Sequence, residues 1–257
     1  MTIHLLLAAA VLAAAAPAAD AQDNATKVGI VEHLGETLPL DTEVYDEQGN
    51  LVTLRSLVDR PTILMFVYYK CPGICTPLLT EVAGIVDKMK LEPGTDYRIL
   101  TVSFDPEEKP ELARDKKETY LGQVERTVDP AGWRFLTAEP QAIEALTRAT
   151  GFRFTREQGE WVHSGALIAL SPSGKITRYL VGIRHLPFDV TMALYEAHEG
   201  RTGPTIAKVM KFCFTYDPEG RRYAFDIVRM GGLVVVGLAG VFAAVVLFRP
   251  RAKQGNA

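Results

Sequence analysis

Thr62-Ile63-Leu64-Met65-Phe66-Val67-Tyr68 is an unbroken apolar run, and Cys71-Pro72-Gly73-Ile74-Cys75 follows it almost at once. The run has the length and the β-branched and aromatic content of a buried strand. Residues 78–89 then show helical spacing, so we expect a helix over residues 74–90. If the cysteine pair begins that helix, a spacing of four places both sulfurs on one face. The positive end of the helix dipole would then favour thiolate over thiol.

A strand that leads into two cysteines at the start of a helix is typical of a thioredoxin-like scaffold. Thiolates are the attacking species in disulfide exchange, and they are also soft ligands for copper and zinc. The pair therefore predicts either redox exchange or metal binding.

The remaining patterns predict strands that alternate with helices. Gly/Pro-rich turns and apolar periodicity place the boundaries. The expected elements are a hairpin over 43–53, strands over 97–104 and 133–136, helices over 110–121 and 139–150, a second hairpin over 166–170 and 176–181, and a last helix over 188–198. This order predicts an α/β fold with a central mixed sheet and helices on both faces.

Composition excludes some partners and leaves others open. The formal net charge is −3, and no basic patch with interleaved aromatic residues occurs, so we expect no nucleic-acid partner. Three cysteines are too few for a disulfide framework, and one pair with a leftover fits a working site better.

Both ends of the chain are apolar. Residues 1–21 have the pattern of a secretory signal peptide with an Ala19-Asp20-Ala21 cleavage site. Residues 230–248 contain no charged residue and would rise about 28 Å as a helix, which suits a transmembrane span. We expect residues 201–229 to be a membrane-proximal segment and 249–257 a cytoplasmic tail. The main domain would then lie in the periplasm, anchored to the bacterial inner membrane.

His163 is the histidine that we expect to join the cysteine pair. It stands in Glu160-Trp161-Val162-His163-Ser164-Gly165, which we place in the loop before the strand over 166–170. In a thioredoxin-like sheet this loop passes close to the cysteines. His33, His185 and His198 are interpreted as surface or half-buried residues.

Residues 69–75, Val102-Ser103-Phe104-Asp105-Pro106 and His163-Ser164 together resemble the Sco/SenC family. Members are membrane-tethered, thioredoxin-like copper proteins that help to assemble the copper centre of cytochrome oxidase. The resemblance covers roughly residues 28–200. It implies copper, Cu(I) or Cu(II), bound by Cys71, Cys75 and His163, and it associates Asp105 with the site and with partner exchange. A turn-former that ends a strand is the other interpretation of Asp105.

The chain departs from the family pattern in three places. Thr76 stands where many members have proline, and Val162 where many have aspartate. The expected anchor is C-terminal, as in a bacterial subset of Sco-like proteins that also carries the run Cys213-Phe214-Thr215-Tyr216-Asp217-Pro218. The partner implied is therefore a respiratory oxidase subunit or another copper client.

Several alternatives stay open. Zinc also accepts two Cys and one His. A thiol-disulfide oxidoreductase would use Cys71 to attack a client disulfide and Cys75 to resolve it, with a thiol reductant protein as partner. Cys213 is a half-buried residue, a ligand for docking or transfer near the membrane, or a site of intermolecular pairing.

Overall fold

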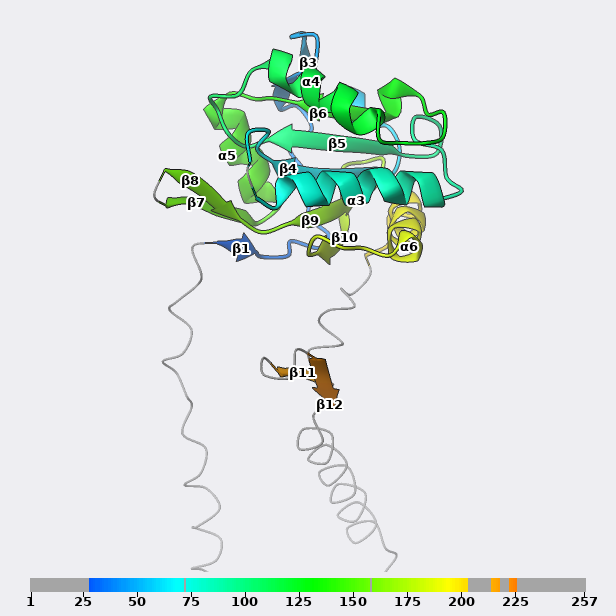
Figure 1. The fold of residues 1–257 in the computed structure, drawn as a ribbon. Coiled ribbons are helices and arrows are strands. Elements are labelled where there is room, and N and C mark those ends of the chain that lie inside the picture. The colour runs from blue at the N-terminus through cyan, green and yellow to red at the C-terminus, as the bar shows by residue number, and fades with distance from the viewer. Residues whose placement is uncertain (1–27, 72, 158, 203–213, 218–221, 226–257) are drawn as a thin grey trace, which may run out of the picture.

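The computed structural model describes a mixed five-stranded sheet with helices packed against it (Figure 1). The described residues are 28–71, 73–157, 159–202, 214–217 and 222–225. The elements in chain order are β1 (Gly29–Ile30), β2 (Glu43–Tyr45), β3 (Leu51–Thr53), α2 (Leu54–Leu57), β4 (Thr62–Val67), α3 (Cys75–Lys88), β5 (Arg98–Ser103), α4 (Pro110–Leu121), the 3-10 turn η2 (Pro130–Gly132), β6 (Trp133–Leu136), α5 (Pro140–Ala149), β7 (Phe152–Glu157), β8 (Glu160–His163), β9 (Ala166–Leu170), β10 (Ile176–Val181), α6 (Pro187–His198), β11 (Phe214–Asp217) and β12 (Arg222–Phe225).

The central sheet has the strand order β10-β9-β4-β5-β6. Strands β4, β5 and β6 run parallel, β9 pairs antiparallel with β4, and the edge strand β10 pairs antiparallel with β9, so it runs in the same direction as β4. Every residue of β4 is buried. Its continuous apolar sequence follows from this position, because a strand covered on both faces has no polar side to present.

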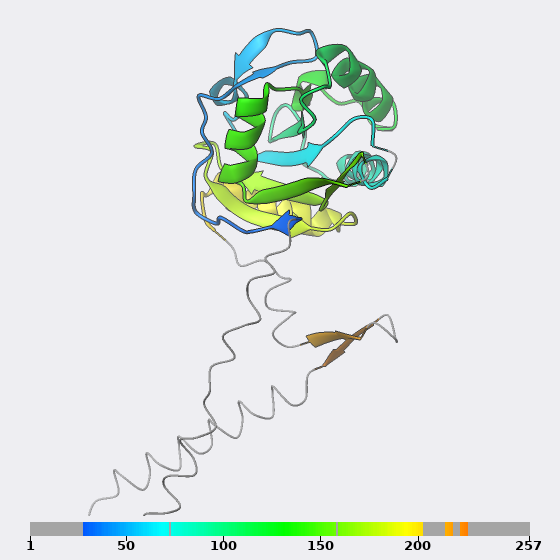
Figure 2. The ribbon, with the colours of Figure 1, turned by 90° about the vertical axis from the view of Figure 1, so that its left-hand side faces the viewer.

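Helices cover both faces of this sheet. Figure 2 shows α5 on the opposite side of the central sheet from α3 and α4. Helix α6 packs against β9 and β10, and it also contacts α3. The layered α/β arrangement predicted from the alternation of strands and helices is therefore confirmed.

The strand that carries His163 differs from the prediction. Strands β7 and β8 pair antiparallel in a separate three-stranded sheet of order β1-β7-β8. His163 is the last residue of β8, paired with Phe154, and does not lie in a loop. A loop was predicted because Glu157, Gly159 and Glu160 interrupt the alternation of apolar and polar residues that begins at Phe152 and Phe154, and this prediction was wrong.

Helix α3 begins later than the cysteine argument requires. Cys75 is its first residue and Ile74 is the N-cap, so Cys71 lies before the helix in the β4–α3 loop. The premise that both sulfurs share one helical face was wrong. Cys71 reaches the site through the conformation of the loop.

The two apolar termini lie outside the described residues, as do the expected signal (1–21), span (230–248) and tail (249–257). Within the part of the chain that the structure describes, no helix combines the length and the apolar character needed to cross a bilayer. In the expected membrane-proximal segment, β11 and β12 pair as an antiparallel hairpin.

Glu47, in the turn between β2 and β3, is a carboxylate that joins three elements. Its side chain has 0% exposure. It accepts hydrogen bonds from Lys117 Nζ at 3.0 Å, from Arg134 Nη2 at 2.8 Å and from the Phe135 amide at 2.8 Å. Burial opposes ionisation, but the bonds from Arg134, Phe135 and Lys117 outweigh it and lower the pKa of Glu47. The folded state therefore holds Glu47 ionised.

We expect Glu47→Gln to lower the free energy of unfolding by about 2 kcal/mol at neutral pH, because it removes the counter-charge of half-buried Lys117 and the nearer of the two carboxylates paired with Arg134. The folded pKa of Glu47 lies below the unfolded value of about 4.3. The stabilisation is thus present above that value and is lost as the pH falls through the folded pKa. Urea unfolding should show that the difference in free energy of unfolding between wild type and variant is smaller at acidic than at neutral pH. A difference that does not change with pH would contradict this account.

Candidate metal centre

Three side chains from separate elements converge at the end of β4. The thiols of Cys71 and Cys75 and the imidazole of His163 each offer one ligand atom, and these atoms all lie within 4.8 Å of one another. Cys75 Sγ and His163 Nε2 are 3.3 Å apart. The β4–α3 loop, the first turn of α3 and the end of β8 supply one residue each. The structure thus brings together the three residues selected from the sequence.

The two thiols have different surroundings. Cys71 is half-buried and accepts a hydrogen bond from the Gly73 amide at 3.3 Å, whereas Cys75 is 2% exposed. Both are free cysteines. Cys71 is therefore the more accessible sulfur.

The same surroundings separate the pKa values of the two thiols. A hydrogen bond from the Cys75 side chain lowers the pKa of Cys71 to about 4, helped by the Cys75 and Gly73 amides. The bond to Cys71 and burial raise the pKa of Cys75. The expected preference for thiolate holds for Cys71 but is wrong for Cys75, since the two sulfurs share one proton in a buried place.

Hydrogen bonding and ring packing hold His163 in place. The residue is 8% exposed, and its Nδ1 lies 3.1 Å from the Ser164 carbonyl oxygen. A carbonyl oxygen only accepts, so Nδ1 carries the proton there, and in that tautomer the lone pair is on Nε2, which faces Cys75. The rings of Phe104 and Phe152 pack against the imidazole at centroid distances of 4.9 and 5.9 Å. The imidazole nitrogen nearest the thiols is thus free to act as a ligand.

A shallow cavity of about 250 Å³ connects the site with solvent. It is lined by Tyr68, Cys71, Gly73, Ile74, Glu160, Trp161, Val162 and His163. The Tyr68 hydroxyl donates to Glu160 at 3.2 Å across one side of it. An ion or a partner can therefore approach from the side of Cys71.

Asp105 lies beside the site and outside the three-residue cluster. Its Oδ1 accepts from the Glu107 amide at 3.0 Å and its Oδ2 accepts from Trp161 Nε1 at 3.1 Å. The first contact is that of a turn-former, as one interpretation expected. The second reaches the strand that carries His163. Cys213 lies outside the described residues.

Glu108 was not selected from the sequence, and it also borders the site. The residue is 3% exposed and accepts from the amides of Tyr69 and Lys70, which immediately precede Cys71. The available signal was an acidic residue three positions after Asp105, in a turn that follows a buried strand. That signal does not identify the amides it meets, because they are 38 and 39 positions away.

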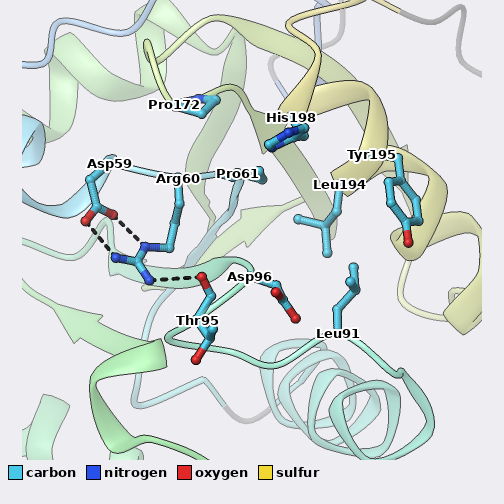
Figure 3. A pocket seen from close by; sticks show the side chains of 10 residues that line it. All are labelled: Asp59, Arg60, Pro61, Leu91, Thr95, Asp96, Pro172, Leu194, Tyr195 and His198. Carbon is cyan, nitrogen blue, oxygen red and sulfur yellow. Dashed lines mark hydrogen bonds and ion pairs between the residues drawn. The ribbon is translucent and has the colours of Figure 1, made fainter.

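A larger cavity of about 500 Å³ lies by the loops that precede β4 and β5, at the opposite strand ends from the thiols (Figure 3). Asp59, Arg60, Asp96, Tyr195 and His198 are among its lining residues. Arg60 is already engaged by Asp59 and by the Thr95 carbonyl. His198 is exposed, as interpreted from the sequence.

The donor set at the end of β4 fits a soft metal ion. Two sulfurs and one imidazole nitrogen match the ligands of copper, and with an open fourth position they also match zinc. Metal binding requires Cys75 to lose the proton that burial makes it keep. The cluster can therefore hold a metal or, as two thiols, exchange disulfides.

The sequence of this chain is similar to those of known proteins. The SCO1/SenC family matches residues 38–186, which is more than half of the chain. The SCO1 protein homolog of Bacillus subtilis (strain 168) is 26% identical over 161 residues, covering 59% of this chain and 80% of that protein. A Stutzerimonas stutzeri protein named "Putative copper-binding protein" is 26% identical over 146 residues, covering 54% of this chain and 66% of that one.

The fold comparison agrees with the sequence comparison. The crystal structure of a "putative electron transfer protein" from Aquifex aeolicus VF5 superimposes with a TM-score of 0.59 at 27% identity, covering 65% of this chain and 95% of that one. The residues that match the family, 38–186, contain the β4–α3 loop, the turn at Asp105 and His163. The resemblance drawn from the motifs is confirmed, and the chain belongs to the SCO1/SenC family.

Proposed function

We propose that this protein is a copper carrier that delivers the ion to the copper centre of a respiratory oxidase. The observation that carries the proposal is the convergence of Cys71, Cys75 and His163 within 4.8 Å in a member of this family. The copper-binding name of the Stutzerimonas relative supports the choice of copper over zinc. Copper is the cargo, so the site must both bind it and give it up.

The unequal thiols suit stepwise loading and release. Cys71 is half-buried and ionised at neutral pH, so it is the first group available to an arriving ion. Cys75 and His163 lie deeper, and Cys75 gives up a proton as it becomes a ligand. Release to a client would reverse this order. Cys75 and His163 would let go of the ion first, and Cys71, the more accessible sulfur, would hold it last, where a partner can reach it.

A thiol-disulfide oxidoreductase is the second candidate, and one observation favours it. A low-pKa, accessible Cys71 next to a buried, protonated Cys75 is the arrangement of an attacking and a resolving thiol. Cys71 would attack a client disulfide to form a mixed disulfide. Cys75 would then displace the client thiolate, leaving a Cys71–Cys75 disulfide, a reduced client and a need for an external thiol reductant.

The setting that we propose is the bacterial inner membrane. Residues 1–21 would direct export, 230–248 would span the bilayer, and the domain of residues 28–200 would work in the periplasm. Residues 201–229 would link that domain to the span, and 249–257 would remain cytoplasmic. The proposal rests on the sequence patterns of segments outside the described residues.

The copper proposal predicts that the reduced full-length protein binds one equivalent of copper with sulfur-to-copper charge-transfer absorption. Cys71→Ser, Cys75→Ser and His163→Ala should each weaken binding by at least about tenfold, because each removes a ligand. Exposed His198, replaced by Ala, is the matched control and should bind as wild type. Stoichiometric, wild-type copper binding by His163→Ala would overturn the carrier proposal. Client-disulfide reduction lost only in the cysteine variants would then favour the oxidoreductase.

The thiol pair makes a separate pH prediction. In the metal-free protein, alkylation of Cys71 should follow a midpoint near pH 4, far below that of an ordinary thiol. In Cys75→Ala the largest stabilising hydrogen bond is removed, so the midpoint should move upward. Mass spectrometry after alkylation across a pH series measures both. Alkylation midpoints that are the same for Cys71 and Cys75, and close to that of an ordinary thiol, would contradict the difference in pKa between them.

The topology makes a third prediction. The full-length protein should stay with the membrane fraction after alkaline carbonate washing, while a chain ending at Arg229 should be released into the periplasm. A protease added to spheroplasts should digest the domain. Protection of the domain under those conditions would place it on the other side of the membrane.

A further inference from the structure

The turn that follows β5 contacts the backbone that precedes Cys71 and the strand that carries His163. Glu108 accepts from the backbone just before Cys71, and Asp105 accepts from Trp161, two residues before His163. We propose that the Asp105–Glu108 turn sets the separation between the thiols and the imidazole, so that Asp105 and Glu108 are positioning residues for the metal. This inference rests on the proposed function and adds to it the device that holds the ligands in register.

Glu108 holds the thiol loop through two consecutive amides. The Tyr69 amide donates to Oε2 at 2.7 Å, and the Lys70 amide donates to Oε1 at 2.8 Å. The next amide, that of Cys71, donates to the Tyr68 carbonyl at 3.2 Å. Cys71 lies outside helix α3, so no helical hydrogen bond fixes its backbone. The carboxylate of Glu108 supplies that constraint instead.

Asp105 holds the imidazole strand through Trp161. The indole Nε1 donates to Asp105 Oδ2 at 3.1 Å, and the indole ring packs edge-on against Phe104 at a centroid distance of 5.9 Å. Side chains two apart on a strand point to the same face. Fixing Trp161 against the end of β5 therefore orients the face of β8 that carries His163.

The turn is rigid enough to act as one reference point. The Glu108 amide donates to the Asp105 carbonyl at 3.2 Å. Ser103 Oγ lies 2.6 Å from Glu108 Oε2, to which it donates, and it accepts from the Asp105 amide at 3.2 Å. The backbones of Asp105 and Glu108 are thus bonded to each other, and both residues are bonded to Ser103, the last residue of β5. A shift of the thiol loop or of β8 away from the turn would have to break the bonds that Glu108 and Asp105 accept from them.

Conservative variants test the turn without removing any ligand. In Glu108→Gln only one oxygen remains for two amides. We expect copper affinity of the reduced full-length protein, measured by competition with a chromophoric Cu(I) chelator, to fall about tenfold. The charge-transfer absorption of the copper-loaded protein should also shift, because the sulfur geometry changes. Ser103→Ala, which removes one hydrogen bond to Glu108, should give a smaller change of the same kind.

Glu47→Gln is the matched control. Glu47 is also a buried carboxylate that accepts a backbone amide, but its partners are Lys117, Arg134 and Phe135, away from the thiol loop. It should lose stability yet keep wild-type copper affinity and absorption. A loss of affinity in Glu47→Gln equal to that in Glu108→Gln would show a general stability effect and overturn the inference.

A double-mutant cycle tests whether Asp105 acts through Trp161. Asp105→Ala and Trp161→Phe should each weaken copper binding, and the double variant should be no weaker than the worse single one, because both remove the bond between Asp105 and Trp161. Additive losses would refute the coupling.

Hydrogen exchange gives a readout that needs no metal. In Glu108→Gln the amides of Tyr69 and Lys70 should exchange faster, while in Glu47→Gln they should change only as much as global unfolding does. If wild type binds no copper, the proposed function fails, and this exchange result still decides whether Glu108 holds the loop. If wild type binds copper and Glu108→Gln matches it in affinity, absorption and exchange, the positioning role is wrong.

Discussion

The parallel pairing of β4 with β5 is the constraint on which the site depends. Val67 lies opposite Ser103, and the Phe104 amide donates to the Val67 carbonyl at 2.9 Å, so the two strands end side by side. The segments that leave them are therefore neighbours: the thiol loop from β4 and the Asp105–Glu108 turn from β5. A shift in register would move Glu108 away from the amides that precede Cys71. The apolar core of the sheet thus fixes the geometry of a polar site at its edge.

Local patterns predicted most of the elements, because turns and caps are local. The helix over 110–121 begins and ends as expected, since Pro110 suits its first position. The sequence did not place Cys71 before the helix, because a spacing of four also fits a pair within a first helical turn, and the Glu108 contact with the Lys70 amide joins residues 38 positions apart. His163 on a strand was also missed, because the β7–β8 pair is held by packing with Phe104 and by Trp161. The convergence of the cysteines and His163 was expected from the fold, while the means that hold them there were not.

The metal-free cluster keeps its two sulfurs in different protonation states. One accessible sulfur with a lowered pKa and one buried sulfur with a raised pKa are what a single shared proton produces at short range. Such a pair can react with either a metal ion or a disulfide, because the more accessible thiolate, that of Cys71, can bind the first and attack the second. Thiol chemistry by itself therefore does not separate the two candidate functions.

His163 is the residue that separates them. Disulfide exchange needs only an attacking and a resolving thiol, and an imidazole 3.3 Å from the resolving sulfur would serve it solely as a base that takes the Cys75 proton. A metal carrier needs a third donor, held where the sulfurs are, with its lone pair free. The Nδ1 contact to the Ser164 carbonyl leaves the Nε2 lone pair facing Cys75, and the surrounding rings hold it there. Hydrogen bonding and packing from several elements therefore hold the imidazole where a third donor would stand, which is the position that the proposed copper carrier requires.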